Sequence, residues 1–158
     1  FYNIEIKSRP EWDGTFHPEP EAFARRVLTA VHEGGVAGRT TIQSFDARAL
    51  RAARQLRDDE PPEGAVRLAL LVVRGTAGLL PEQIDELGFT PDLYSPAHAS
   101  VDEALVHAAH DRGLQVVPWT VNEREQMRRL LRLGVDGLIT DYPDVGRDVV
   151  AAMAPTAE

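Results

Sequence analysis

Short β-rich runs alternate with amphipathic helical runs along the whole chain. In the helical runs apolar residues recur three and four positions apart, as at Phe23, Val27, Leu28 and Val31, whereas the strand runs are short and rich in β-branched residues. Strands are expected at 1–7, 40–45, 66–73, 92–94, 115–121 and 135–140. Helices are expected at 18–33, 46–57, 81–87, 100–112, 122–133 and from 143 onward. The pattern therefore predicts six consecutive βα units.

Two of these helices begin with polar residues that suit a helix start. Ser100 is followed by Glu103 three positions later, which predicts a capping box, and Gly113 then ends the helix. Asn122 with Glu125 predicts the cap of the next helix. Asn122 is thus better explained as a cap than as a ligand.

Strict alternation of strands and helices predicts a parallel sheet covered by helices. An open doubly wound sheet and an arc of a TIM (βα)8 barrel both have this order. A doubly wound nucleotide-binding sheet carries a Gly-rich turn after its first strand, whereas Lys7 is followed by Ser8, Arg9 and Pro10. A complete barrel needs about 250 residues in eight units. We therefore interpret residues 1–158 as a single, N-terminally incomplete barrel domain that supplies strands 3–8.

Composition and charge exclude several classes of function. A formal net charge of −8 argues against binding to nucleic acid or to an acidic membrane surface. The longest apolar run, 66–73, is too short to span a bilayer, so no stable membrane insertion is expected. The absence of cysteine excludes disulfides, thiolate metal sites and a cysteine nucleophile. An acidic protein that binds an anionic substrate needs a cation at its binding site. The sequence does not determine the cellular compartment.

The first candidate chemistry lies in the first strand. Side chains two apart on a strand share a face, so Asn3, Glu5 and Lys7 are predicted to point into the barrel and Ile4 and Ile6 toward the helices. Glu5 and Lys7 fall at the C-terminal end of the strand, where barrel active sites are built. Charges inside a barrel are costly unless they are paired or bound to a metal. The pattern alone leaves open a structural Glu–Lys pair and a functional site.

Four segments, in this order and spacing, make the chain resemble the glycerophosphodiester phosphodiesterase family over about residues 1–150. They are Ile4-Glu5-Ile6-Lys7, Ser44-Phe45-Asp46, Trp119-Thr120-Val121-Asn122 and the run GVDGLITDYPD that begins at Gly134. Each segment alone would be a weak signal, and their joint occurrence is specific. The resemblance implies a metal-dependent phosphoric diester hydrolase. Its expected small-molecule substrate is a glycerophosphodiester, which the parent enzyme cleaves to sn-glycerol 3-phosphate and an alcohol.

The resemblance also implies roles for individual residues. Glu5 corresponds to a carboxylate ligand of one divalent cation, Mg²⁺ or Ca²⁺, and Lys7 to the lysine that approaches the substrate phosphate. Trp119 is either the aromatic wall beside the glycerol group or an ordinary core tryptophan. Phe45 either lines the same mouth or has a packing role. Asp141 is expected to be mainly structural.

The family's His-Arg-Gly, Pro-Glu-Asn and Glu-Leu-Asp segments do not occur in this sequence, and its one His-Asp pair, His110-Asp111, falls in the helix predicted at 100–112. In the family these segments carry the general acid and base and the remaining metal ligands. No catalytic residue is therefore predicted within the chain, and the two histidines are expected upstream of Phe1. Of the five histidines present, only His98 follows a strand end. We expect the isolated chain to be inactive, and a missing N-terminal segment or a second copy to complete the barrel.

Two other functions remain open at this point. One is a lysophospholipase D-like or other phosphodiester hydrolase on the same barrel. The other is a non-catalytic barrel remnant that acts in binding or assembly.

Overall fold

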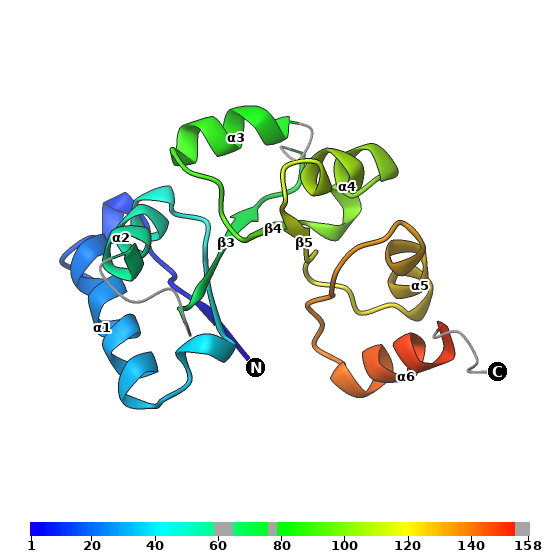
Figure 1. The fold of residues 1–158 in the computed structure, drawn as a ribbon, viewed down its shortest axis with the longest axis horizontal. Coiled ribbons are helices and arrows are strands. Elements are labelled where there is room, and N and C mark those ends of the chain that lie inside the picture. The colour runs from blue at the N-terminus through cyan, green and yellow to red at the C-terminus, as the bar shows by residue number, and fades with distance from the viewer. Residues whose placement is uncertain (59–64, 76–78, 154–158) are drawn as a thin grey trace. The chain divides into compact units, whose positions relative to one another are not determined.

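The computed structural model describes residues 1–58, 65–75 and 79–153. The chain divides into two compact units (Figure 1). The first unit is Phe1–Leu71 with Pro81–Leu93, and the second unit is Val72–Leu80 with Tyr94–Glu158. This division does not test the prediction that residues 1–158 form a single barrel domain.

The first unit contains three parallel strands and three α-helices. Strand β1 pairs with β2 and β2 pairs with β3, so that Glu5 lies opposite Gln43 and Gln43 lies opposite Ala69. Strand β3 and helix α3 each extend by one end residue into the second unit. The elements in chain order are β1 (Tyr2–Glu5), a 3₁₀ helix (Pro10–Trp12), α1 (Pro20–Glu33), a 3₁₀ helix (Ala37–Arg39), β2 (Thr40–Ser44), α2 (Ala47–Asp58), β3 (Arg67–Val72) and α3 (Leu80–Leu87).

The second unit continues the alternation of strands and helices. Its backbone ladder is parallel, with the amide of Val117 donating to Tyr94 at 3.0 Å and that of Trp119 donating to Pro96 at 3.1 Å. Helices α5 and α6 lie side by side (Figure 1). The elements are β4 (Leu93–Pro96, its first residue in the first unit), a 3₁₀ helix (His98–Ser100), α4 (Glu103–His110), β5 (Gln115–Val116), α5 (Arg124–Arg132) and α6 (Pro143–Met153).

All six predicted helices are present, but the last two predicted strands are not formed as expected. The strand predicted at 115–121 is reduced to Gln115–Val116, although the amides of Val117 and Trp119, on either side of Pro118, still donate to the neighbouring segment. The segment 135–140 is not a strand, although the amide of Val121 donates to Ile139 at 2.8 Å and that of Ile139 donates to Pro118 at 2.9 Å. The described residues thus contain five strands where six were predicted.

The capping box predicted at Ser100 is wrong. Ser100 ends the 3₁₀ helix that precedes α4, and α4 begins at Glu103. The capping residue is Asp102, whose Oδ1 accepts a hydrogen bond from the amide of Leu105 at 2.8 Å. An aspartate directly before the first turn satisfies one of the free amides at the helix start as well as a serine does.

The cap predicted at Asn122 is also wrong. Helix α5 is preceded by Glu123, which makes no side-chain capping bond. The side chain of Asn122 is used elsewhere, since its Oδ1 accepts from the amide of Asp141 at 3.0 Å and from Oγ1 of Thr140 at 3.2 Å. Asn122 therefore fastens the loop between the last strand-like segment and α6.

The core of the first unit lies between its strands and the paired helices α1 and α2 (Figure 1). Ile6 and Ile42 are fully buried in this core, and Ile4 packs against it, partly buried. The prediction that the two isoleucines face the helices is confirmed, which places Glu5 and Lys7 on the opposite face of the strand. Within the described residues no helix combines the length and the apolar character needed to cross a membrane.

The core assignment predicts a large difference between two identical substitutions. Leu28 on α1 is 4% exposed within the core, whereas Leu79 is 53% exposed. Leu28→Ala should lower the free energy of unfolding by about 2–5 kcal/mol, because it removes buried methyl groups and leaves a cavity. Leu79→Ala should change it by less than about 0.5 kcal/mol. Denaturant unfolding of both variants checks this, and equal losses would contradict the assignment.

Candidate functional site

Glu5 and Lys7 lie together at the C-terminal end of β1. The ammonium of Lys7 is 3.7 Å from Oε2 of Glu5, and the two side chains are 76% and 25% exposed respectively. A pair at this distance with one exposed partner adds little to stability. The ammonium of Lys7 is therefore available to an anion while it remains beside the carboxylate.

The second oxygen of Glu5 is the unusual atom of this site. Oε1 is buried and has no hydrogen-bond partner among the residues that the structure describes. Its neighbours on the same face are already paired with each other, since Nδ2 of Asn3 donates to Oε1 of Gln43 at 3.0 Å. A buried acceptor without a donor costs about 1–3 kcal/mol, and more when it is charged. Such an atom is expected where a ligand or ion completes the site.

The residues present fit a metal site only in part. A carboxylate oxygen without a partner is what a hard divalent cation takes as a ligand. Within ranges 1–58, 65–75 and 79–153, however, no three His, Cys, Asp or Glu residues come together in a group that could hold a metal. Glu5 thus fits as one ligand, and these residues do not supply the rest of a ligand set.

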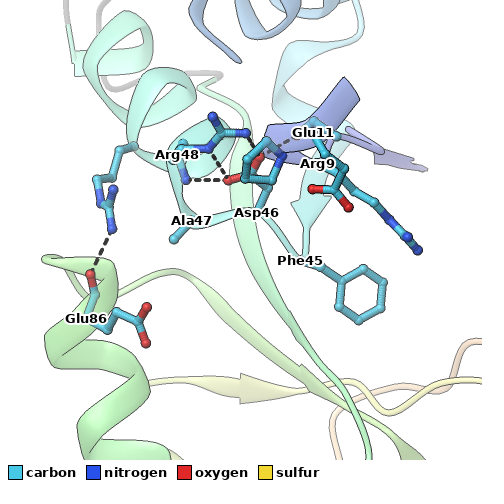
Figure 2. A pocket seen from close by; sticks show the side chains of 10 residues that line it. Arg9, Glu11, Phe45, Asp46, Ala47, Arg48 and Glu86 are labelled. Carbon is cyan, nitrogen blue, oxygen red and sulfur yellow. Dashed lines mark hydrogen bonds and ion pairs between the residues drawn. The ribbon is translucent and has the colours of Figure 1, made fainter. Parts of the chain in front are cut away.

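A second cluster joins the loops that follow β1 and β2. The guanidinium of Arg48 donates to Asp13 through Nη1 at 2.6 Å and through Nη2 at 3.3 Å. It also donates to Asp46 through Nη2 at 2.8 Å and through Nε at 3.1 Å. Oγ of Ser8 donates to the same Asp46 at 2.9 Å. We call these four residues the Arg48 clamp, and Figure 2 shows the bonds between Arg48 and Asp46.

The charges within the Arg48 clamp stabilise one another. Burial acts to raise the pKa of Asp46, but the hydrogen bonds from Arg48 and Ser8 outweigh it, so the pKa lies below its usual range. The hydrogen bonds to Asp46 and Asp13 raise the pKa of Arg48. Asp46 and Arg48 are therefore both ionised at neutral pH.

His17 closes the loop after β1 and has no free ring nitrogen. Its Nε2 accepts from the amide of Arg9 at 2.9 Å, and its Nδ1 lies 2.9 Å from the carbonyl oxygen of Pro18, which assigns the hydrogen to Nδ1. The carboxylate of Asp13 lies 3.7 Å from Nδ1. The sequence placed His17 in a loop, and the structure shows that it holds this loop together.

An open pocket of about 550 Å³ lies where the loops after β1 and β2 approach α3. Phe45 is 43% exposed at this pocket. Figure 2 shows the Phe45 ring directed away from Arg48 and Asp46. Whether Phe45 contacts substrate or only packs stays a prediction. The lining residues are Ser8, Arg9, Pro10, Glu11, Phe45, Asp46, Ala47, Arg48, Arg51 and Glu86.

Trp119 belongs to the second unit, where its indole is fixed to the neighbouring strand. Nε1 donates to the carbonyl oxygen of Ser95 at 2.9 Å, and the side chain is partly buried. Its role beside a glycerol group stays a prediction. His98 follows β4 as expected, and its amide donates to Trp119 at 2.8 Å, while its own Nδ1 is buried without a partner. Asp141 accepts from Nδ2 of Asn122 at 2.8 Å, in keeping with a structural role.

Sequence reasoning missed two features of the site. The long-range bonds of the Arg48 clamp join side chains 35 and 38 positions apart, so no local sequence pattern predicts them. The other feature was visible in the composition, because Lys7 is the only lysine among 17 Lys and Arg residues. Arginine occupies all the remaining positions of these 17, so the compact charge of a lysine ammonium occurs only at Lys7.

Comparison with known proteins points to one family. A family model described as the glycerophosphoryl diester phosphodiesterase family matches residues 2–145. A glycerophosphodiester phosphodiesterase of Bacillus subtilis is 28% identical over 144 residues, which cover 91% of this chain and 47% of the relative. The glycerophosphodiester phosphodiesterase of Caldanaerobacter subterraneus is also 28% identical over 144 residues, covering 90% and 52%. The chain therefore spans about half the length of the curated relatives it matches.

Solved structures agree on the fold. A Silicibacter pomeroyi structure whose protein carries the name of the same family superposes with a TM-score of 0.76 at 31% identity, covering 94% of this chain and 49% of that one. An Oleispira antarctica phosphodiesterase, solved with the product sn-glycerol-3-phosphate, gives 0.72 at 18% identity, covering 94% and 54%. At this identity the second likeness shows the fold alone. The predicted α/β class with a parallel sheet and a TIM-barrel fold is confirmed, whereas the six units are not.

The lowered pKa of Asp46 predicts how stability changes in acid. A carboxyl whose pKa is lower in the folded state stabilises the fold above its unfolded pKa, near 3.8, and this contribution disappears as the pH falls further. Asp46→Asn should therefore lower the free energy of unfolding by about 1–3 kcal/mol at pH 7, because it removes the negative charge and one of the two acceptor oxygens that Arg48 and Ser8 use. The difference from the parent chain should shrink below about pH 4.

Denaturant unfolding at several pH values measures this difference. Asp58→Asn is the matched control, because Asp58 is half exposed and its ion pairs are with Arg54 and Arg57 of its own helix α2. It should cost less than about 0.5 kcal/mol at pH 7. A difference for Asp46→Asn that stays constant down to pH 2 would contradict the ionised clamp.

Proposed function

Because the chain belongs to the glycerophosphoryl diester phosphodiesterase family, we propose that this protein acts in the hydrolysis of glycerophosphodiesters to sn-glycerol 3-phosphate and an alcohol. The observation that carries the proposal is the pairing of Glu5 and Lys7 at the C-terminal end of β1, with one Glu5 oxygen buried and unpaired. The C-terminal ends of the strands are where barrel enzymes build their active sites. The product bound by the Oleispira antarctica phosphodiesterase supports the same substrate class.

Lys7 is proposed to hold the substrate phosphate. Its ammonium is a compact point charge on a flexible stem, and it is largely exposed, so it can donate to phosphate oxygens without breaking a strong bond first. Glu5 keeps the ammonium nearby through its Oε2. No other lysine occurs in the given sequence, so Lys7 is its only side chain that can offer an ammonium group to phosphate.

Glu5 is also proposed as one ligand of a divalent cation, Mg²⁺ or Ca²⁺. Its unpaired Oε1 would gain the partner that the protein does not provide. Such a cation, when bound, supplies positive charge to the phosphate oxygens. The remaining ligands would come from outside the described residues, since no group of three His, Cys, Asp or Glu residues that could hold a metal forms there.

Hydrolysis also needs a proton acceptor and a proton donor. Both ring nitrogens of His17 are engaged in its own loop. His32, His107 and His110 lie on helices, which form the outer layer of a barrel. His98 comes from the second unit, and its Nδ1 is buried. We therefore propose that the acid–base pair comes from a segment outside these 158 residues, and that the chain by itself binds phosphate without turning the substrate over.

A lysophospholipid-type substrate is the second candidate. The half-exposed ring of Phe45 favours it, because this ring lines a pocket together with Ser8, the residue after Lys7, where it would contact an apolar alcohol. Paired assays with glycerophosphocholine and lysophosphatidylcholine, on a preparation with hydrolytic activity, separate the two. A Phe45→Ala substitution that lowers only the activity on lysophosphatidylcholine would support the second candidate.

The role of Lys7 predicts a selective loss of product binding. Lys7→Met should weaken the binding of sn-glycerol 3-phosphate by about 10–100-fold, because one charged hydrogen bond is removed. Arg25→Ala is the control, since Arg25 is an exposed residue of α1 whose one recorded ion pair is with Glu21. Calorimetric titration of the full chain measures both. Equal affinities of the two variants would contradict the proposed role of Lys7 in binding phosphate.

A further inference from the structure

We propose that Arg48 is a positioning residue for Lys7, and that the Arg48 clamp holds the loop after β1 so that the Lys7 ammonium is presented to a phosphate. This inference rests on the proposed function in one respect, namely that Lys7 contacts phosphate. Arg48 itself has no direct part in the reaction. It acts through Asp46 and Ser8.

The backbone on both sides of Lys7 is fastened to the loop after β2. Before Lys7, the carbonyl oxygen of Ile6 accepts from Oγ of Ser44 at 2.7 Å. After Lys7, the hydroxyl of Ser8 donates to Asp46 at 2.9 Å. Ser44 and Asp46 are themselves joined, because the amide of Asp46 donates to Oγ of Ser44 at 3.0 Å. The exposed Lys7 side chain therefore projects from a short backbone segment that is anchored at both ends.

Arg48 determines whether this anchor holds. Asp46 accepts from Ser8 and also from the Arg48 guanidinium through two nitrogens, so the acceptor is oriented by Arg48. The other branch of the same guanidinium binds Asp13, further along the loop that begins with Ser8. Without Arg48, two carboxylates would face each other without a cation, and like charges at short range repel. The loop would then lose both of its charged attachments.

The geometry calls for arginine at this position. The guanidinium is a planar fork with five donors, and here it serves two carboxylates at once. A lysine at position 48 could satisfy one carboxylate at a time. Arg48→Lys is therefore expected to behave like Arg48→Ala in phosphate binding while it keeps the charge of the chain unchanged.

A double-mutant cycle tests whether Arg48 acts through Lys7. The probe is sn-glycerol 3-phosphate, titrated calorimetrically into the full chain and into Arg48→Ala, Lys7→Met and the double variant. Arg48→Ala is expected to raise the dissociation constant about tenfold, within the range seen for coupled neighbours. In the Lys7→Met background the same substitution should change it less than about twofold, because the residue through which Arg48 acts is gone.

A purely structural role for Arg48 gives a different result. Loss of folded protein lowers the number of binding sites and leaves the dissociation constant of the remaining sites unchanged. An unchanged constant in Arg48→Ala, or equal effects of that substitution with and without Lys7, would overturn the inference. If Lys7→Met itself does not weaken binding, the proposed function fails as well, so the two failures are distinguishable.

Ser8→Ala provides a milder second variant in case Arg48→Ala does not fold. It removes one hydroxyl and leaves the Arg48 ion pairs intact, and the inference predicts weaker phosphate binding in the same direction. Thr15→Ala is a matched control, because its hydroxyl belongs to the same loop and takes no part in the clamp. Weakening by Ser8→Ala without weakening by Thr15→Ala supports the inference, and equal affinities overturn it.

The single lysine gives a direct view of the ammonium. Reductive methylation with a ¹³C label keeps the positive charge of an amino group. It labels one side chain, Lys7, and the amino terminus, so the NMR spectrum contains two signals. In the parent chain the Lys7 signal should shift when inorganic phosphate is added. In Arg48→Ala the shift should require about tenfold more phosphate, whereas Arg25→Ala should match the parent. A phosphate response of Arg48→Ala that is identical to the parent overturns the inference.

Discussion

The guanidinium of Arg48, placed between two carboxylates, is the interaction on which the candidate site depends. It joins the loops that leave two neighbouring parallel strands, and it does so at the strand ends where a barrel binds its substrate. Salt bridges on a protein surface usually contribute little. This one differs because its carboxylates are largely shielded from water and because one of them also accepts from the residue next to Lys7. An ion pair that would add little stability on an exposed surface thus affects the geometry of the site around Lys7.

The alternation of side chains along β1 explains why the charged residues are where they are. Burial of Ile6, with Ile4 packed beside it, against the helices leaves the other face of the strand to Asn3, Glu5 and Lys7. A register shift by one residue would bury both charges and expose both isoleucines, so the hydrophobic effect fixes the direction of Glu5 more strongly than any polar contact does. This arrangement leaves one Glu5 oxygen buried without a hydrogen-bond partner among the described residues, which is unfavourable. The burial of apolar side chains in the core of the first unit offsets that unfavourable free energy.

The fold class and the direction of the Glu5–Lys7 pair could be predicted from sequence because both follow from local periodicity. The helices were placed within a few residues, since each has its own apolar stripe. The Asn122 cap failed for a different reason, because the side-chain oxygen of Asn122 accepts from partners 18 and 19 positions away. The Arg48 clamp could not be predicted, because its four residues are ordinary polar and charged types that are brought together by the parallel pairing of β1 and β2.

The double anchoring of the backbone around Lys7 has a thermodynamic consequence for ligand affinity. The conformational entropy of that backbone segment is already lost when the chain folds, so an arriving anion need not order it. The side chain of Lys7, in contrast, is largely exposed and keeps most of its rotamers, which lets the ammonium follow phosphate oxygens as they move. A fixed backbone that carries a mobile side chain suits a ligand whose charge is redistributed while it is bound.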